Sequence, residues 1–178
     1  LLARSFDRLD IDRMRAELAD WSLRGEIERA AKRARTRTSD RALPKLTRER
    51  DGARHIVDQP PLVTHTSDRE TGQLIEGLEA YLDTLPPHWH RVIGYYMVVD
   101  LAHKVVRVGS VGLRAYVALL QGNDPSDVVF LQLKQARRSC VARFVHGDTA
   151  WHAHQGQRVV EYQQTLQTVS DPLLGWTT

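Results

Sequence analysis

A stretch of strand-forming residues interrupted by glycines constrains the fold more than any other part of the sequence. Residues 105–122 read Val-Val-Arg-Val-Gly-Ser-Val-Gly-Leu-Arg-Ala-Tyr-Val-Ala-Leu-Leu-Gln-Gly, and residues 128–134 read Val-Val-Phe-Leu-Gln-Leu-Lys. The valine, leucine and tyrosine residues around Gly109 and Gly112 indicate that the glycines connect two strands and do not open a helix. The last strand carries a single lysine, Lys134. Three strands are predicted, over residues 98–108, 113–121 and 128–135.

A glycine-tipped hairpin of this kind has a direct chemical use. Because Gly109 and Gly112 lack a Cβ atom, the backbone N–H groups of the tip, which also includes Ser110 and Val111, can approach a polyphosphate. Lys134 stands alone in an apolar strand and supplies a positive charge that can reach those phosphates. The pattern therefore predicts a phosphate-binding site made of a hairpin and the strand that follows it.

The composition bounds the class of protein. The 178 residues suffice for a domain with a buried core, and 42% hydrophobic with 26% charged residues is ordinary for a soluble protein. No apolar run is long enough to span a bilayer, no signal peptide opens the sequence, and Cys140 is the single cysteine, so we expect a cytoplasmic protein. The net charge of +3 permits an anionic ligand without indicating nucleic acid. Both ends look cut, so we expect a fragment of a longer protein.

The remaining pattern predicts an α+β chain. Asp51-Gly52 between two extended runs predicts a small hairpin over residues 45–57, and an edge strand is expected at 62–64. We expect a helical region with this hairpin over 1–97, followed over 98–178 by an antiparallel sheet with one helix. Helices are predicted over residues 10–21, 23–36, 68–85, 88–96 and 156–169. A fourth strand of the second region is predicted at 173–178.

The helix predicted after the third strand contains one carboxylate, Glu161. A glutamate beside a buried helix face needs a partner, and Lys134 has the charge and the strand position to provide it. Taken singly, a solvated glutamate and a snorkelling lysine are the simpler interpretations. Together with the glycine hairpin, the order of the parts favours a nucleotide site in which Glu161 holds Lys134. Four apolar residues of the helix are spaced for burial against the sheet: Val159, Tyr162, Leu166 and Val169.

Other interpretations of the glycine motif fit less well. A Rossmann turn needs a helix after its glycines, whereas Leu113–Leu120 reads as a strand. The G-x-x-G loop of a KH module joins two helices, and strand-like residues flank this one.

Two further segments have simpler interpretations than a catalytic, metal-binding or nucleic-acid-binding site. His146-Gly147-Asp148 copies the start of a phosphotransferase catalytic loop, but it follows the third strand and no asparagine comes after it at a useful distance. With His152 and His154 it forms a polar loop without the fixed geometry that a metal needs, so no metal site is predicted. Acidic residues interrupt the basic helix at 24–37, which favours a solvated face over a nucleic-acid contact.

Five segments carry motifs that are specific to one family: 37–46 (Arg-Thr-Ser-Asp-Arg-Ala-Leu-Pro-Lys-Leu), 99–112 (Val-Asp-Leu-Ala-His-Lys-Val-Val-Arg-Val-Gly-Ser-Val-Gly), 130–136 (Phe-Leu-Gln-Leu-Lys-Gln-Ala), 156–161 (Gly-Gln-Arg-Val-Val-Glu) and 170–176 (Ser-Asp-Pro-Leu-Leu-Gly-Trp). Together they resemble an uncharacterised bacterial family, domain of unknown function 2252, and the resemblance covers nearly the whole chain. Its longer members look related to aminoglycoside-phosphotransferase-like kinases and carry a Gly-Asp-x-His-type catalytic segment and an acidic metal-binding segment upstream. The resemblance thus implies a protein-kinase-like small lobe that binds ATP with Mg²⁺, in an internal fragment of such a protein.

In a kinase-like small lobe a glycine hairpin covers the phosphates, a third-strand lysine binds them, and a glutamate of the next helix holds the lysine. The resemblance assigns these roles to Gly109, Ser110 and Gly112, to Lys134 and to Glu161.

The chain departs from the kinase pattern at Arg107, which stands where the first glycine of a G-x-G-x-x-G loop belongs. No catalytic base or metal-binding aspartate is identified, so we expect this chain to bind ATP and to transfer no phosphate. The competing expectation is a non-catalytic domain that binds a partner. The acceptor substrate is not predicted.

Overall fold

The computed structural model describes residues 25–26, 28–29, 32, 46–50, 53–105, 112–145, 152–167 and 170–178. By packing, the chain divides into two compact units, residues 1–47 and 48–178. The described residues between 25 and 32 are helical, as predicted there, whereas the helix predicted at 10–21 lies outside the described residues.

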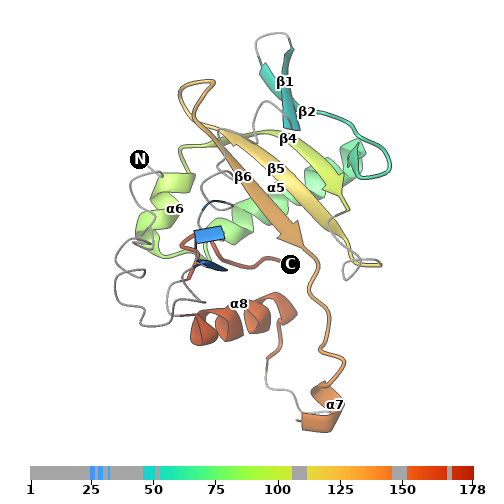
Figure 1. The fold of residues 1–178 in the computed structure, drawn as a ribbon, viewed down its shortest axis with the longest axis vertical. Coiled ribbons are helices and arrows are strands. Elements are labelled where there is room, and N and C mark those ends of the chain that lie inside the picture. The colour runs from blue at the N-terminus through green and yellow to red at the C-terminus, as the bar shows by residue number, and fades with distance from the viewer. Residues whose placement is uncertain are drawn as a thin grey trace. The chain divides into compact units, whose positions relative to one another are not determined.

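The larger unit is built on a four-stranded antiparallel sheet of order β3-β4-β5-β6. Figure 1 shows β4, β5 and β6 side by side. A separate two-stranded sheet pairs β1 with β2. The predicted α+β class, the three consecutive strands, the small hairpin and the edge strand are confirmed. The sheet takes its first strand from upstream of residue 97, so it crosses the predicted regional boundary. The strands are β1 (Thr47–Arg50), β2 (Ala53–Ile56), β3 (Val63–His65), β4 (Met97–Lys104), β5 (Ala115–Gln121) and β6 (Val128–Lys134).

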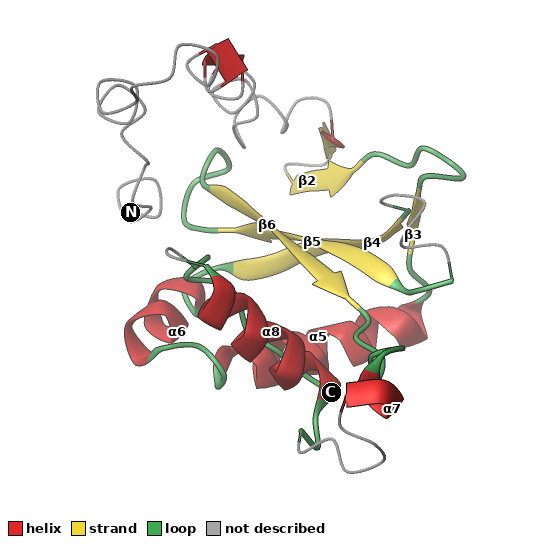
Figure 2. Cartoon of the chain, turned by 60° about the horizontal axis from the view of Figure 1, so that its bottom comes forward, coloured by secondary structure: helices red, strands yellow, loops and turns green. Residues whose placement is uncertain are grey.

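Helices cover one side of the four-stranded sheet, and β2 lies on the other side (Figure 2). Ser67 is the N-cap of the first of them. Its hydroxyl accepts from the backbone N–H of Glu70, while the Glu70 carboxylate accepts from the backbone N–H of Ser67. This capping box stabilises the first turn. Helices α5 (Asp68–Leu82), α6 (Pro87–Ile93) and α8 (Gln155–Leu166) form this layer, whereas the short α7 (Ala142–Val145) lies beyond the end of β6, away from the sheet (Figure 1).

Strand β5 is the centre of the core because residues 115–120 are all buried. Alternate residues of a strand point to opposite faces of the sheet. On the face toward β2, Ile56 packs with buried residues of three strands. The residues of this β2-side cluster are Ile56, Val63, Ala102, Val117 and Leu119, with Val99, Val128 and Phe130 packed against them.

The strand predicted at 173–178 is wrong, because this segment lies against α5 and joins no sheet. The Tyr81 hydroxyl donates to the Leu173 carbonyl, and the Thr84 hydroxyl accepts from the Trp176 N–H at 3.1 Å. Side chains of α5 and of the turn after it therefore satisfy backbone groups that a sheet edge was expected to satisfy.

We expect Gly175→Ala to lower the free energy of unfolding by about 1–3 kcal/mol, because overpacking of a filled site is destabilising. A Cβ atom at Gly175 would lie 2.6 Å from the Thr84 hydroxyl and 2.7 Å from Cε2 of the Tyr81 ring. Urea denaturation followed by circular dichroism measures the change. Gly72→Ala in α5 is the matched control, since its Cβ meets no atom within 4 Å. That control should be neutral or stabilising, by up to about 1 kcal/mol; equal stabilities of the two variants would show that the segment is not docked on α5.

Candidate functional site

The base of the predicted glycine hairpin is formed as expected, by β4 and β5. Gly112 has a φ of +82°, a backbone conformation that residues with a Cβ rarely adopt. Its carbonyl accepts from Nη2 of Arg137 at 3.1 Å. Gly109, Ser110 and Val111 lie outside the described residues.

Lys134 is exposed at the end of β6 and lies directly opposite Ala115 of β5. A second lysine, Lys104, ends β4 and lies opposite Val63. The register of β4 with β5 continues from His103 opposite Tyr116, and therefore places Lys104 beside Ala115. The two lysines thus flank Ala115 in one row across the sheet, on the face that carries the β2-side cluster.

Neither lysine side chain forms an ion pair or a hydrogen bond within the described part of the chain. Lys104 is half-buried and Lys134 is exposed. The root of the glycine hairpin therefore presents two positive charges on one sheet face, a combination that suits an anionic ligand.

Glu161 has partners other than Lys134. Its carboxylate is 2.8 Å from Nε2 of His152 and accepts from Nε2 of Gln157 at 2.7 Å. The hydrogen bond with His152, and then the one from Gln157, lowers the pKa of Glu161. Helix α8 lies on the helical side of the sheet and Lys134 belongs to the opposite face (Figure 2). The structure therefore does not bring the two charges together.

Two histidines that the sequence assigned to a solvated loop make defined contacts with α8. The His152 side chain is 6% exposed and contacts Glu161, and Nδ1 of His154 accepts from the backbone N–H of Gln157 at 3.0 Å, which caps α8. Sequence reasoning missed this cap because histidine is not among the usual N-cap residues. His146, Gly147 and Asp148 lie outside the described residues.

The predicted buried face of α8 is also wrong. Val160 is the buried residue of the helix, whereas Val159 is 41%, Tyr162 44% and Leu166 83% exposed. Val169 lies outside the described residues. The helix is thus turned so that its apolar stripe faces away from the core.

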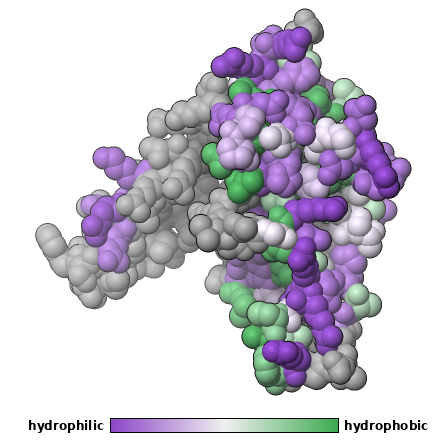
Figure 3. Space-filling view, turned by 90° about the vertical axis from the view of Figure 1, so that its right-hand side faces the viewer, coloured by the Kyte–Doolittle hydropathy of each residue, from purple (hydrophilic) through white to green (hydrophobic). Residues whose placement is uncertain are grey.

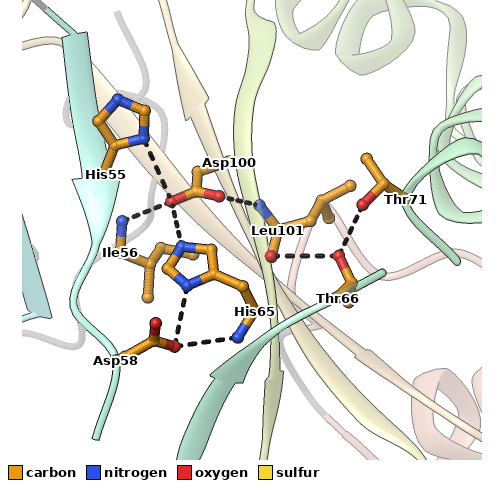
Figure 4. Close-up of polar contacts among 8 residues, drawn as sticks. All are labelled: His55, Ile56, Asp58, His65, Thr66, Thr71, Asp100 and Leu101. Carbon is orange, nitrogen blue, oxygen red and sulfur yellow. Dashed lines mark hydrogen bonds and ion pairs between the residues drawn. The ribbon is translucent and has the colours of Figure 1, made fainter. Parts of the chain in front are cut away.

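A second polar cluster, not anticipated from the sequence, surrounds Asp100 of β4 (Figure 4). The side chain is 11% exposed and follows an irregularity in the pairing of β4 with β5. Its carboxylate accepts from the backbone N–H of Ile56 at 2.6 Å and of Leu101 at 2.8 Å. Nε2 of His65 lies at 3.2 Å and Nδ1 of His55 at 3.8 Å. The usable sequence signal is a lone carboxylate inside an apolar strand, which needs partners.

His65 lies between two carboxylates, since its Nδ1 is 2.8 Å from Oδ1 of Asp58 and its Nε2 is near Asp100. Burial works to lower the pKa of His65, but the hydrogen bonds and charges of Asp58 and Asp100 outweigh it and raise the pKa. The hydrogen bond from His65 lowers the pKa of Asp58. With both ring nitrogens engaged, His65 is suited to be a structural cation and has no free nitrogen for a metal or for a proton transfer.

Within the described residues, no group of three or more His, Cys, Asp or Glu side chains is arranged to hold a metal ion. No helix of the same residues has the length and apolar character needed to cross a membrane.

The fold and the site define an α+β domain with helices on one face of an antiparallel sheet and a cationic hairpin root on the other. The chain belongs to the bacterial family described as "Uncharacterized protein conserved in bacteria (DUF2252)", whose model matches residues 2–178. This confirms the family resemblance. No curated protein and no solved structure is significantly similar to the chain.

Proposed function

We propose that this chain supplies part of a nucleotide-binding site, which takes ATP with Mg²⁺, in a kinase-like phosphotransferase. The observation that carries the proposal is the shared row of Lys104 and Lys134 at the root of the glycine hairpin, where neither ammonium group forms an ion pair or hydrogen bond within the described residues. Catalytic residues for phosphate transfer would come from another part of such a protein.

The ligand chemistry follows from the charges. Two ammonium groups act as point charges toward phosphate oxygens, and the backbone N–H groups of a glycine turn can bind the same oxygens without steric hindrance. Gly112 has the positive φ that such a turn requires. In this arrangement Lys104 shares the phosphate contact with Lys134, while Glu161 stabilises the start of α8 through Gln157 and His152.

A partner-binding domain is the second candidate, and exposed apolar residues favour it. On the face drawn in Figure 3, hydrophobic side chains gather around α7, where Val141 is 54% and Phe144 73% exposed. Helix α8 adds Leu166, which is 83% exposed. Exposed apolar patches are typical of protein interaction sites.

Calorimetric titration of MgATP into the full chain tests the nucleotide proposal. We expect saturable binding that Lys134→Ala weakens by roughly tenfold, the effect of losing one charge-assisted contact. The matched control is Arg91→Ala, which removes an exposed positive charge from the last turn of α6 and should leave the affinity unchanged. No heat of binding with the folded wild-type chain would contradict the proposal. An equal loss of affinity in both variants would show that the net charge of the chain, and not a specific site, causes the binding.

A further inference from the structure

The attachment of β2 to the four-stranded sheet depends on side chains. Strand β2 belongs to the other sheet, so no backbone ladder joins it to β3, β4, β5 or β6. Its Ile56 side chain packs in the β2-side cluster, and its Ile56 N–H donates to the Asp100 carboxylate at 2.6 Å. Nε of Arg54 also donates to the Pro125 carbonyl at 2.8 Å. Asp100 is therefore the polar link between β2 and β4.

A single histidine ring connects this link to the segment that follows β2. Nε2 of His65 is 3.2 Å from Asp100, and Nδ1 is 2.8 Å from Asp58, two residues beyond the end of β2 (Figure 4). The backbone N–H of His65 donates to the same Asp58 carboxylate at 3.0 Å. Both ends of the ring thus face a carboxylate, one on the segment that follows β2 and one on β4.

The charges around the His65 ring decide which protonation state the ring prefers. Among the described residues, the titratable groups that face His65 are Asp58 after β2 and Asp100 of β4, and His55 of β2 faces Asp100 at 3.8 Å. A protonated ring donates from both nitrogens, whereas a neutral ring donates from one and leaves a lone pair against the other carboxylate. Loss of the proton therefore breaks one of the two hydrogen bonds and leaves the two carboxylates uncompensated by His65.

We propose that His65 is a proton-operated latch, which holds β2 on the sheet in its protonated form and releases it when the proton is lost. The face that β2 covers is the one that carries Val117, Leu119 and, in the next row, Lys104 and Lys134. Release of β2 therefore changes access to that face. The latch itself does not depend on the proposed nucleotide site.

The direction of the pH dependence follows from the two shifted groups. The pKa of His65 is raised above its ordinary 6.5, so the stabilisation from the ring is complete below that value and is lost as the pH rises through the folded-state pKa. The pKa of Asp58 is lowered below its ordinary 3.8, so its stabilisation is present above that value and is lost as the pH falls through the folded-state pKa. Strand β2 is held most firmly between these two ordinary values.

Amide hydrogen exchange of the full chain, measured by NMR at about pH 5.5 and about pH 8, tests the latch, with each rate corrected for its intrinsic pH dependence. We expect the protection of the Ile56 amide to fall several-fold at the higher pH, while that of Ala118 in β5 stays constant. His65→Gln should give weak protection of Ile56 at both pH values. The matched control, His88→Gln in α6, exchanges an exposed histidine that has no carboxylate partner among the described residues and should keep the wild-type dependence.

Equal protection of Ile56 at the two pH values in the wild-type chain would overturn the latch, and so would a wild-type pH dependence in His65→Gln. If His65→Gln does not fold, Asp58→Asn takes its place, because the Asp58 side chain is 53% exposed and its substitution leaves the core intact. That variant should show a clearly reduced pH dependence, and an unchanged one would also overturn the proposal.

Discussion

Asp100→Asn should lower the free energy of unfolding by about 2–4 kcal/mol, although the two side chains have nearly the same size. Asp100 is 11% exposed and accepts from the backbone N–H groups of Ile56 and Leu101 and lies within hydrogen-bond distance of His65. An asparagine amide has one accepting oxygen and turns an NH₂ group toward the other donors. At least one buried donor therefore loses its partner, and the attachment of β2 weakens.

Urea denaturation at constant pH measures this loss. Asp83→Asn is the matched control, because the Asp83 side chain is 81% exposed and lies 3.7 Å from His90. A substitution at such a site should change the stability by less than about 0.5 kcal/mol. If Asp100→Asn is as stable as this control, the carboxylate does not hold β2 on the sheet.

The double variant Lys104→Ala/Lys134→Ala should weaken MgATP binding by about a hundredfold, since each lysine is expected to contribute about tenfold. The two residues share one row of the sheet, so their charges act on the same ligand. Calorimetry of the single and double variants gives the coupling between them directly.

The control for this double variant is Lys104→Arg/Lys134→Arg, which keeps both positive charges and should retain most of the affinity. Binding that is lost in the arginine variant would show that the site needs the shape of lysine and not only its charge. Binding that survives in the alanine variant would place the nucleotide elsewhere and would leave the exposed residues of α7 and α8 as the better guide to function.

Local sequence patterns predicted most of the secondary structure, because they depend on interactions between near neighbours. The helix predicted at 68–85 is α5, and Asp51-Gly52 correctly marked the hairpin of β1 and β2. The apolar run before Gln121 correctly indicated the strand that the structure has at Ala115–Gln121. These features require no knowledge of the rest of the fold.

The candidate site was less predictable, because it depends on which residues share a face. Lys134 and Glu161 are suitable partners by charge, but strand register places Lys134 on the β2 side while α8 lies on the helical side. The other charged residue in the row of Lys134 is Lys104, and the attraction of opposite charges does not predict that two lysines share a row. Likewise, His152 became the neighbour of Glu161 only through the packing of the segment before α8.

The sequence alone determined the α+β class, the strands around the glycine hairpin and the family to which the chain belongs. Only the tertiary structure decided that Lys104 joins Lys134, that Asp58, His65 and Asp100 meet, and that the C-terminal segment lies against α5. The physical reason is that strand and turn preferences act over a few residues. Register, helix packing and buried hydrogen bonds instead join residues as distant as Tyr81 and Leu173, and they are settled when the whole core forms.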